Sequence, residues 1–135
     1  MELGAYGFGD TQLNPDGSHR STAEASRNLF DAIVHADAAG LDYFGVGEHH
    51  TVSMQASSPG AAVIAAAAGA TKQIKLGSAA SIVGTDDPVR VFQQFAIADA
   101  VSGGGRVEIT AGRGSSVETF PLFGYDLQEY DRTNT

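Results

Sequence analysis

The chain has 135 residues, of which 42% are hydrophobic and 18% charged, a balance typical of one folded domain and not of a disordered or collagen-like chain. Sixteen acidic residues against eight basic ones give a formal net charge of -8, which repels nucleic-acid phosphates and anionic membranes. The chain has no cysteine, which fits a reducing compartment, and its apolar run at residues 61–70 is too short to span a bilayer. We therefore expect a cytoplasmic protein with one domain over residues 1–135, without signal peptide or anchor, and with neither nucleic-acid nor membrane partners.

Apolar segments rich in β-branched and aromatic residues recur along the chain roughly every 30 to 40 residues. They predict four β-strands, at residues 1–8, 41–46, 73–83 and 106–112. Segments with helix signals lie between them. Because strands and helices alternate, we expect an α/β fold with a parallel sheet, right-handed crossovers and helices on at least one face.

The first intervening segment has the clearest helix signals. Ser21 and Glu24 match a capping box, and Gly40 supplies the left-handed stop. The face predicted to pack on the sheet contains Leu29, Ile33 and Ala36.

Two more helices and a tail follow. The second helix is predicted to start near Pro59 and to run through the alanines to about Ala70. The third is capped by Asp87, starts at Pro88 and stops at the glycines that follow Ser102. Its predicted buried face comprises Val91, Phe92, Phe95 and Ala98. Residues 115–135 contain aromatic residues without a clear period, which predicts an extended packed loop with a polar end.

Three stretches fall where the predicted strands end, at residues 47–50, 78–81 and 112–116. In parallel α/β sheets, ligands gather at the carboxyl ends of the strands. These stretches are therefore the candidate functional site.

The adjacent histidines of the first stretch allow several interpretations. A zinc site made by His49, His50 and Glu48 is disfavoured, because adjacent strand residues point to opposite faces. One imidazole that points into a pocket could act as a general base, and the alternative is a histidine hydrogen-bonded to a loop. Glu48 is interpreted as an orienting acceptor, or else as a solvated carboxylate.

The other two stretches are also ambiguous from the residues alone. The small residues 77–80 indicate either close approach to a flat ligand or tight packing against a helix. Arg113 lies between two glycines and before two serines, so it could help to bind a phosphate, or it could form a surface ion pair.

Taken together, "GVGEHH", "AAAAGATKQIKLGSAASIVGTDDPVRVFQQFAIADAVSGGGR" and "TAGRGSSVETFPLFGYD" resemble the bacterial luciferase-like flavin-dependent monooxygenases over nearly the whole chain. The resemblance implies a (β/α)8 barrel that binds reduced FMN, or a deazaflavin in some branches, at the carboxyl ends of its strands. The chain resembles the first half of such a barrel, with four of its strands.

The resemblance also implies roles for individual residues. His49 would face the flavin and act as a base, with His50 flanking it and Glu48 in support. The stretch at Ser78, Ala79 and Ala80 matches the flavin-binding segment that contains a cis peptide bond between the two alanines.

At the end of the fourth strand, the resemblance implies that Arg113 contacts the FMN phosphate. Gly112 falls where luciferase has a reactive cysteine near the flavin, which argues against a strict luciferase.

The implied activity is a monooxygenase that inserts one oxygen of O2 into a small organic substrate, with a flavin reductase as a possible partner. The alternative is a non-catalytic flavin-binding or assembly protein formed by a truncated half-barrel. In either case, four parallel strands leave open edges, so we expect a homo-oligomer or a complementing half-barrel.

Overall fold

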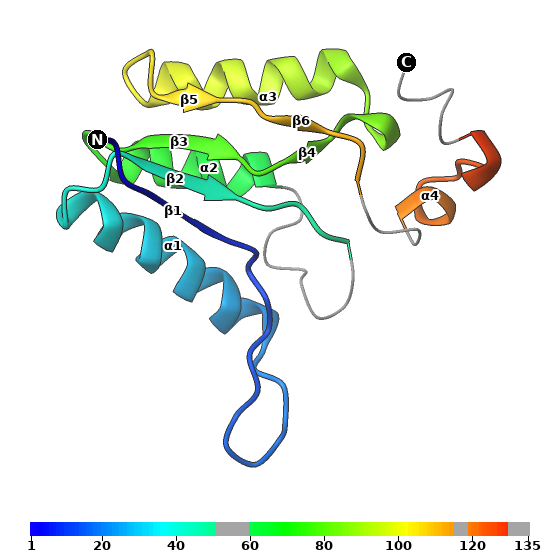
Figure 1. The fold of residues 1–135 in the computed structure, drawn as a ribbon, viewed down its shortest axis with the longest axis horizontal. Coiled ribbons are helices and arrows are strands. Elements are labelled where there is room, and N and C mark those ends of the chain that lie inside the picture. Colours follow the sequence, from blue (N-terminus) through cyan, green and yellow to red (C-terminus); the bar gives the residue numbers. More distant parts are fainter. Residues whose placement is uncertain (51–59, 115–118, 130–135) are drawn as a thin grey trace.

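The structure is a computed structural model that describes residues 1–50, 60–114 and 119–129. Its main sheet has four parallel strands in the order β1-β2-β3-β5. Helices connect the successive strands of this sheet along the chain (Figure 1). The strands are β1 (Gly4–Gly7), β2 (Tyr43–Val46), β3 (Lys75–Ser78) and β5 (Val107–Glu108). The predicted four-stranded parallel α/β fold is confirmed.

Two of the predicted strands are each broken in the structure. The segment predicted at residues 73–83 forms β3, then β4 (Ser81–Ile82), then a one-turn 3-10 helix, η2 (Val83–Thr85). The segment predicted at residues 106–112 forms β5 and then β6 (Ala111–Gly112), and β6 pairs in parallel with β4. The strand pair therefore continues beyond the break, toward the carboxyl ends of the strands (Figure 1).

The Ser78 hydroxyl bridges this break. It accepts a hydrogen bond from the Thr110 amide at 3.0 Å and donates one to the Thr110 carbonyl at 3.1 Å. A hydroxyl can do both at once, so Ser78 replaces the backbone ladder where the two strands lose their regular register.

Helix α1 (Thr22–Ala38) begins and ends as its sequence predicts. Its capping box is present: the Glu24 amide donates to the Ser21 hydroxyl at 3.2 Å, and the Ser21 amide donates to the Glu24 carboxylate at 3.0 Å. Gly40 has φ +80°, the left-handed stop. All three residues predicted on the buried face are buried: Leu29, Ile33 and Ala36.

Helix α2 (Gly60–Ala70) ends at Ala70 and helix α3 (Pro88–Val101) begins at Pro88, both as predicted. Asp87 caps α3, as predicted, by accepting hydrogen bonds from the Val89 and Arg90 amides at 2.9 and 3.0 Å. The prediction that Phe92 is buried is wrong, because its side chain is 69% exposed. One helical residue turns the side chain about 100°, which takes Phe92 away from the face formed by Val91, Phe95 and Ala98. The predicted start of the second helix, at Pro59, lies outside the described residues.

Residues 119–129, the described part of the predicted extended loop at residues 115–135, do not form an extended loop. They form a short helix, α4 (Thr119–Leu122), and a 3-10 turn, η3 (Leu127–Glu129). Phe120 is 1% exposed, whereas Leu122, Phe123 and Tyr125 are exposed. In Figure 1, α4 lies beyond the carboxyl ends of the strands. None of the helices in the described ranges is long and apolar enough to cross a membrane.

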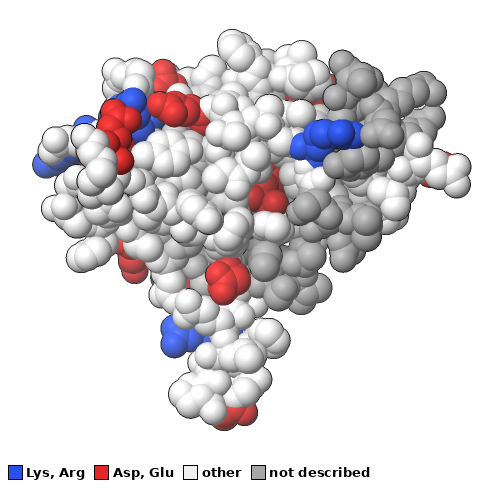
Figure 2. All heavy atoms as spheres, in the orientation of Figure 1, with Lys and Arg blue, Asp and Glu red and all other residues white. Residues whose placement is uncertain are grey.

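The two faces of the main sheet differ. Phe44, Val46 and Leu76 belong to the hydrophobic core that the sheet shares with the helices. On the other face, glycines make room for aromatic rings: a Cβ at Gly45 would lie 3.2 Å from the Tyr43 ring, and one at Gly77 would collide with the Tyr43 hydroxyl. Figure 2 shows the molecule in the same orientation, with acidic and basic side chains gathered at its upper left and mostly uncharged surface across its middle.

Candidate functional site at the strand ends

The carboxyl ends of the strands bring together three of the predicted stretches. Residues 47–50 follow β2, Ala79 and Ala80 lie between β3 and β4, and Gly112 ends β6, directly before Arg113. Because the strands are parallel, these segments lie along one edge of the sheet. Phe8, which follows β1, lies at the same edge.

His49 is half-buried, and its ring is the last of three rings that contact one another in sequence, Tyr6, Phe8 and His49. Its ring is 5.3 Å from that of Phe8, edge to face at 74°, and Phe8 is in turn 5.5 Å from Tyr6 at 82°. Gly47 makes this arrangement possible, since a Cβ there would approach the Phe8 ring to 2.6 Å. The imidazole therefore has an aromatic neighbour on one side, and it remains partly accessible.

His50 has different partners from His49. Its Nε2 lies 3.0 Å from Oε1 of Glu48, and its ring is 4.9 Å from that of Phe123 at 86°. The other carboxylate oxygen of Glu48 accepts a hydrogen bond from the Ile82 amide at 3.2 Å. The side chains of Glu48 and His50 are each only 13% exposed. Glu48 is thus a mostly buried, hydrogen-bonded carboxylate, and its role as an orienting acceptor stays a prediction.

The three side chains considered for a zinc site, those of Glu48, His49 and His50, have different contacts in the structure. Within the described ranges, no group of three or more His, Asp or Glu side chains is arranged to hold a metal ion. Glu48 and His50 contact each other, whereas His49 contacts Phe8.

The bond between Ala79 and Ala80 is cis, the geometry that the resemblance implies for this stretch. The Ala79 amide donates to the Val46 carbonyl at 2.8 Å. Two glycines lie against the alanines: a Cβ at Gly45 would be 3.0 Å from the Ala79 methyl, and one at Gly112 would be 2.9 Å from the Ala80 methyl. Both alanines are half-exposed. Only their methyl groups project from the surface between the histidines and Gly112.

Two of the candidate cofactor-binding residues differ in accessibility. Ser78 is 1% exposed and its hydroxyl bonds to Thr110, so its side chain supports the strands and is not part of the accessible surface. Arg113 is exposed and follows the half-exposed Gly112. The serines at positions 115 and 116 lie outside the described residues.

Three contributors to the site are absent from the sequence-based prediction. Phe8 could have been found by continuing the alternation of strand β1 through Tyr6. Phe123 and the Ile82 amide reach the site through the tertiary fold, and no local sequence signal indicates them.

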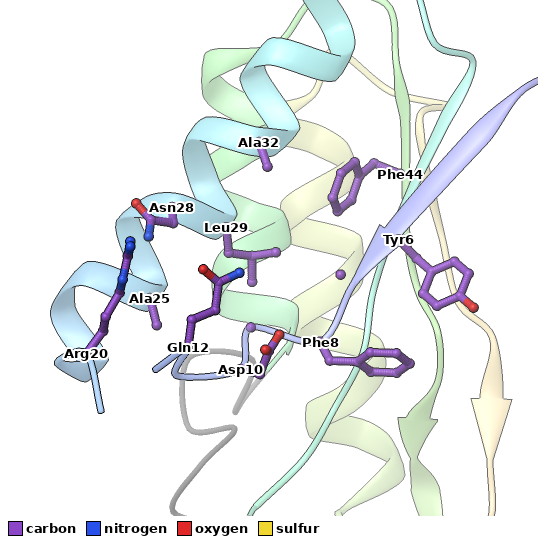
Figure 3. Close-up of a pocket in the computed structure, with 12 residues that line it drawn as sticks. Tyr6, Phe8, Asp10, Gln12, Arg20, Ala25, Asn28, Leu29, Ala32 and Phe44 are labelled. Carbon is purple, nitrogen blue, oxygen red and sulfur yellow. The ribbon is translucent and has the colours of Figure 1, made fainter. Parts of the chain in front are cut away.

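A cavity of about 300 Å³ lies elsewhere, between β1 and α1. Figure 3 shows Leu29 and Phe44 between the helix and the strand, whereas Tyr6 and Phe8 project to the other side of β1. Asp10 and Arg20 also line this cavity. It opens at the edge strand of the sheet, and it includes none of the residues between 47 and 113 that were predicted to form the site.

The fold and the strand-end site define a class: an open, four-stranded part of a (β/α)8 barrel whose candidate site residues gather at the carboxyl ends of the strands. The family model described as luciferase-like monooxygenase matches residues 8–134. The chain belongs to this family.

Related proteins are longer than this chain. An uncharacterized protein of Sinorhizobium fredii, y4vJ, is 28% identical over 84% of the chain and 32% of its own length, and YvbT of Bacillus subtilis is 30% identical over 75% and 30%. The chain thus spans about a third of the length of the curated relatives it matches.

Solved structures share the fold at low identity. Monooxygenase RslO1 from Streptomyces bottropensis matches with a TM-score of 0.83 at 22% identity, over 98% of this chain and 39% of its own. The oxygenating constituent of 3,6-diketocamphane monooxygenase of Pseudomonas putida, in complex with FMN, matches with a TM-score of 0.83 at 21% identity, over 98% and 36%. The coenzyme F420 dependent tetrahydromethanopterin reductase from Methanopyrus kandleri has a TM-score of 0.57 at 22% identity, over 93% and 30%.

Proposed function

We propose that the chain binds a flavin at the carboxyl ends of its strands, with the ring against Ala79 and Ala80 and the phosphate near Arg113. The observation that carries this proposal is the row of small, half-exposed residues that has a histidine at one end and an arginine at the other. Gly112 lies so close to the Ala80 methyl that a Cβ at position 112 would be only 2.9 Å away, and no side chain at this position projects from the surface. A flat, anionic ligand fits such a surface.

FMN is the preferred ligand and a deazaflavin is the second, because structural relatives with this fold include one in complex with FMN and one that depends on coenzyme F420. Reduced flavin, when bound, supplies the electrons that activate O2. The chain would bind and orient the ring, and Phe8 would shield one side of His49 from water.

In this proposal, His49 is the group that accepts or donates a proton at its imidazole. An imidazole has one nitrogen that can accept a proton and one that can donate it, and contact with Phe8 fixes one side of the ring. The reaction class is the insertion of one oxygen of O2 into a small organic substrate, with a flavin reductase as the source of reduced flavin.

A second candidate is a non-catalytic flavin-binding or assembly protein. The open face of the sheet favours it, because Tyr6 is 66% exposed beside the site and a closed barrel would cover it. Binding would then occur without turnover.

Titration of the purified chain with FMN, followed by flavin fluorescence, tests the binding. Oxidation of an organic substrate panel with reduced FMN then separates the two candidates. His49→Ala should retain FMN and lose turnover by about 100-fold or more, the size of a general-base effect, whereas the exposed His35→Ala should match the wild type. Wild-type protein that binds FMN without any turnover supports the second candidate. No flavin binding at all contradicts the first candidate and leaves only the assembly role of the second.

A further inference from the structure

The Glu48 carboxylate connects two segments that are far apart in sequence. One oxygen lies 3.0 Å from His50 Nε2, and the other accepts from the Ile82 amide at 3.2 Å. The side chain is only 13% exposed, so both oxygens have protein partners that water replaces poorly. Hydrogen bonds to a charged, part-buried acceptor are among the stronger ones in proteins.

These contacts hold both ends of the two-residue segment formed by Ala79 and Ala80, which we call the alanine bulge. At the start of the bulge, the Ala79 amide donates a hydrogen bond to the Val46 carbonyl of β2 at 2.8 Å. After the bulge, the Ile82 amide donates to Glu48, two residues further along the same chain segment. Ala79 and Ala80 are therefore bound at each end to the segment that continues into His49.

The same carboxylate restrains the histidine segment. His49 lies between Glu48 and His50, and these two are joined to each other, so the backbone at His49 has little freedom to rotate. The Phe123 ring packs against His50 at 4.9 Å and limits its movement further.

We propose that Glu48 is a positioning residue that sets the placement of His49 relative to the Ala79–Ala80 bulge, acting through His50 and the Ile82 amide. In this assignment Glu48 acts through these two hydrogen-bond partners and not through contact with the flavin. The consequence for turnover rests on the proposed flavin-binding function, whereas the hydrogen-bond network can be tested without it.

The test compares Glu48→Ala, Glu48→Gln and the surface control Asp31→Ala in the full chain. Amide exchange at Ile82, read by NMR, reports the bond directly, and the His50 ring resonances report the second contact. In Glu48→Ala, the Ile82 amide should exchange about 10-fold faster, since it loses a charge-assisted bond. Glu48→Gln should stay within about 3-fold of the wild type, because its amide oxygen can accept from Ile82, and its NH2 group can donate to His50 Nε2 when the ring carries its proton on Nδ1.

Flavin binding and turnover are the second readout. Glu48→Ala should lower kcat about 10-fold or more with a smaller change in KM, since misplacement by about 1 Å costs orders of magnitude in rate. Glu48→Gln should restore most of kcat. Unchanged Ile82 exchange in Glu48→Ala overturns the proposal, and so does a Glu48→Gln variant as impaired as Glu48→Ala, which would assign the role to charge. If the wild type binds no flavin, the proposed function fails while the Ile82 and His50 readouts still decide the network.

Discussion

Replacement of Arg106 is predicted to cause a large loss of stability, because its guanidinium joins the ends of two helices. It donates to the carbonyl of Ala68 in the last turn of α2, to that of Thr71 directly after α2, and to that of Ser102 directly after α3, at 3.0 to 3.2 Å. It also donates to the Thr71 hydroxyl at 3.1 Å and to the Ile74 carbonyl at 2.9 Å. The last carbonyls of a helix have no partner within the helix, so Arg106 satisfies groups that would otherwise need water.

The magnitude follows from these five acceptors. A net contribution of about 1 kcal/mol for each, reduced because water replaces some of the bonds at this half-buried site, gives about 3–5 kcal/mol for Arg106→Met. This loss is a large share of the about 5–15 kcal/mol that stabilises a typical domain. Arg106→Lys should lose about 2–3 kcal/mol, because a lysine has three donors on one nitrogen and cannot reach both helix ends.

Guanidinium unfolding at neutral pH, followed by circular dichroism, measures both variants. Arg90→Met is the matched control, since Arg90 is exposed on α3, and it should change stability by less than about 0.5 kcal/mol. If Arg106→Met unfolds at the same denaturant concentration as Arg90→Met, the helix-end contacts contribute nothing and the reasoning fails. Should Arg106→Met not fold, the milder Arg106→Lys still gives a graded answer.

Two further predictions concern ligand binding and pH. Arg113→Ala should weaken FMN binding about 10- to 100-fold and leave riboflavin, which has no phosphate, unchanged in a fluorescence titration; equal weakening of both ligands would make the arginine structural. The Asp37 carboxylate accepts from the Lys72, Gln73 and Ile74 amides at 2.8 to 2.9 Å; burial raises its pKa, but these bonds and nearby Arg106 outweigh burial and lower the pKa. Because the folded-state pKa lies below the unfolded value of about 3.9, this stabilisation is present above pH ~4 and is lost as pH falls through the folded pKa. Asp37→Asn should therefore flatten the acid dependence of the unfolding free energy, and an unchanged acid slope would contradict the assignment.

Asp99, near the end of α3, accepts hydrogen bonds from three consecutive amides, as Asp37 does near the end of α1. Its carboxylate accepts from the Gly105, Arg106 and Val107 amides at 3.0 Å each. These bonds, led by the Gly105 one, hold the pKa of Asp99 below its ordinary value. Asp37 binds the loop that leads into β3 and Asp99 binds the loop that leads into β5, both at the edge of the sheet opposite the candidate site. In barrels of this kind, that edge serves stability and the strand ends serve function.

Local signals predicted the parts of the fold that local chemistry determines. The Ser21 and Glu24 capping box, the Asp87 cap and the Gly40 stop each depend on residues within a few positions, so the sequence alone was sufficient. The bonds of Asp37 and Arg106 join residues more than thirty positions apart, and only the folded chain brings them together. Phe92 was assigned to the core because it is apolar and near other buried positions, but its place on the helix turns it outward.

The candidate site shows the same division. The adjacent histidines and Arg113 were found as polar residues at predicted strand ends, and the resemblance to the family supplied the cis bond at Ala79. The accessibility of each residue could not be predicted from the sequence. The Ser78 hydroxyl is buried and hydrogen-bonded to the Thr110 backbone, whereas Ala79 is half-exposed. The Glu48 bond to the Ile82 amide depends on β4, which the sequence did not separate from β3.

The open side of the sheet leads to the last prediction, that the chain self-associates or binds a complementing half-barrel. Within the described residues, the main sheet ends at β1 and at β5, and Tyr6, Phe8 and Ile109 are 66%, 38% and 44% exposed there. Parallel strands are normally covered on both faces, and open edges expose unpaired backbone groups. A two-fold pair would cover the same surface on both copies. Light scattering during size exclusion should therefore give a dimer or larger at micromolar concentration, and Tyr6→Lys should shift it toward monomer, while the surface control Asp31→Lys should not. A compact wild-type monomer would contradict the prediction, because it would mean that the open face of the sheet tolerates water.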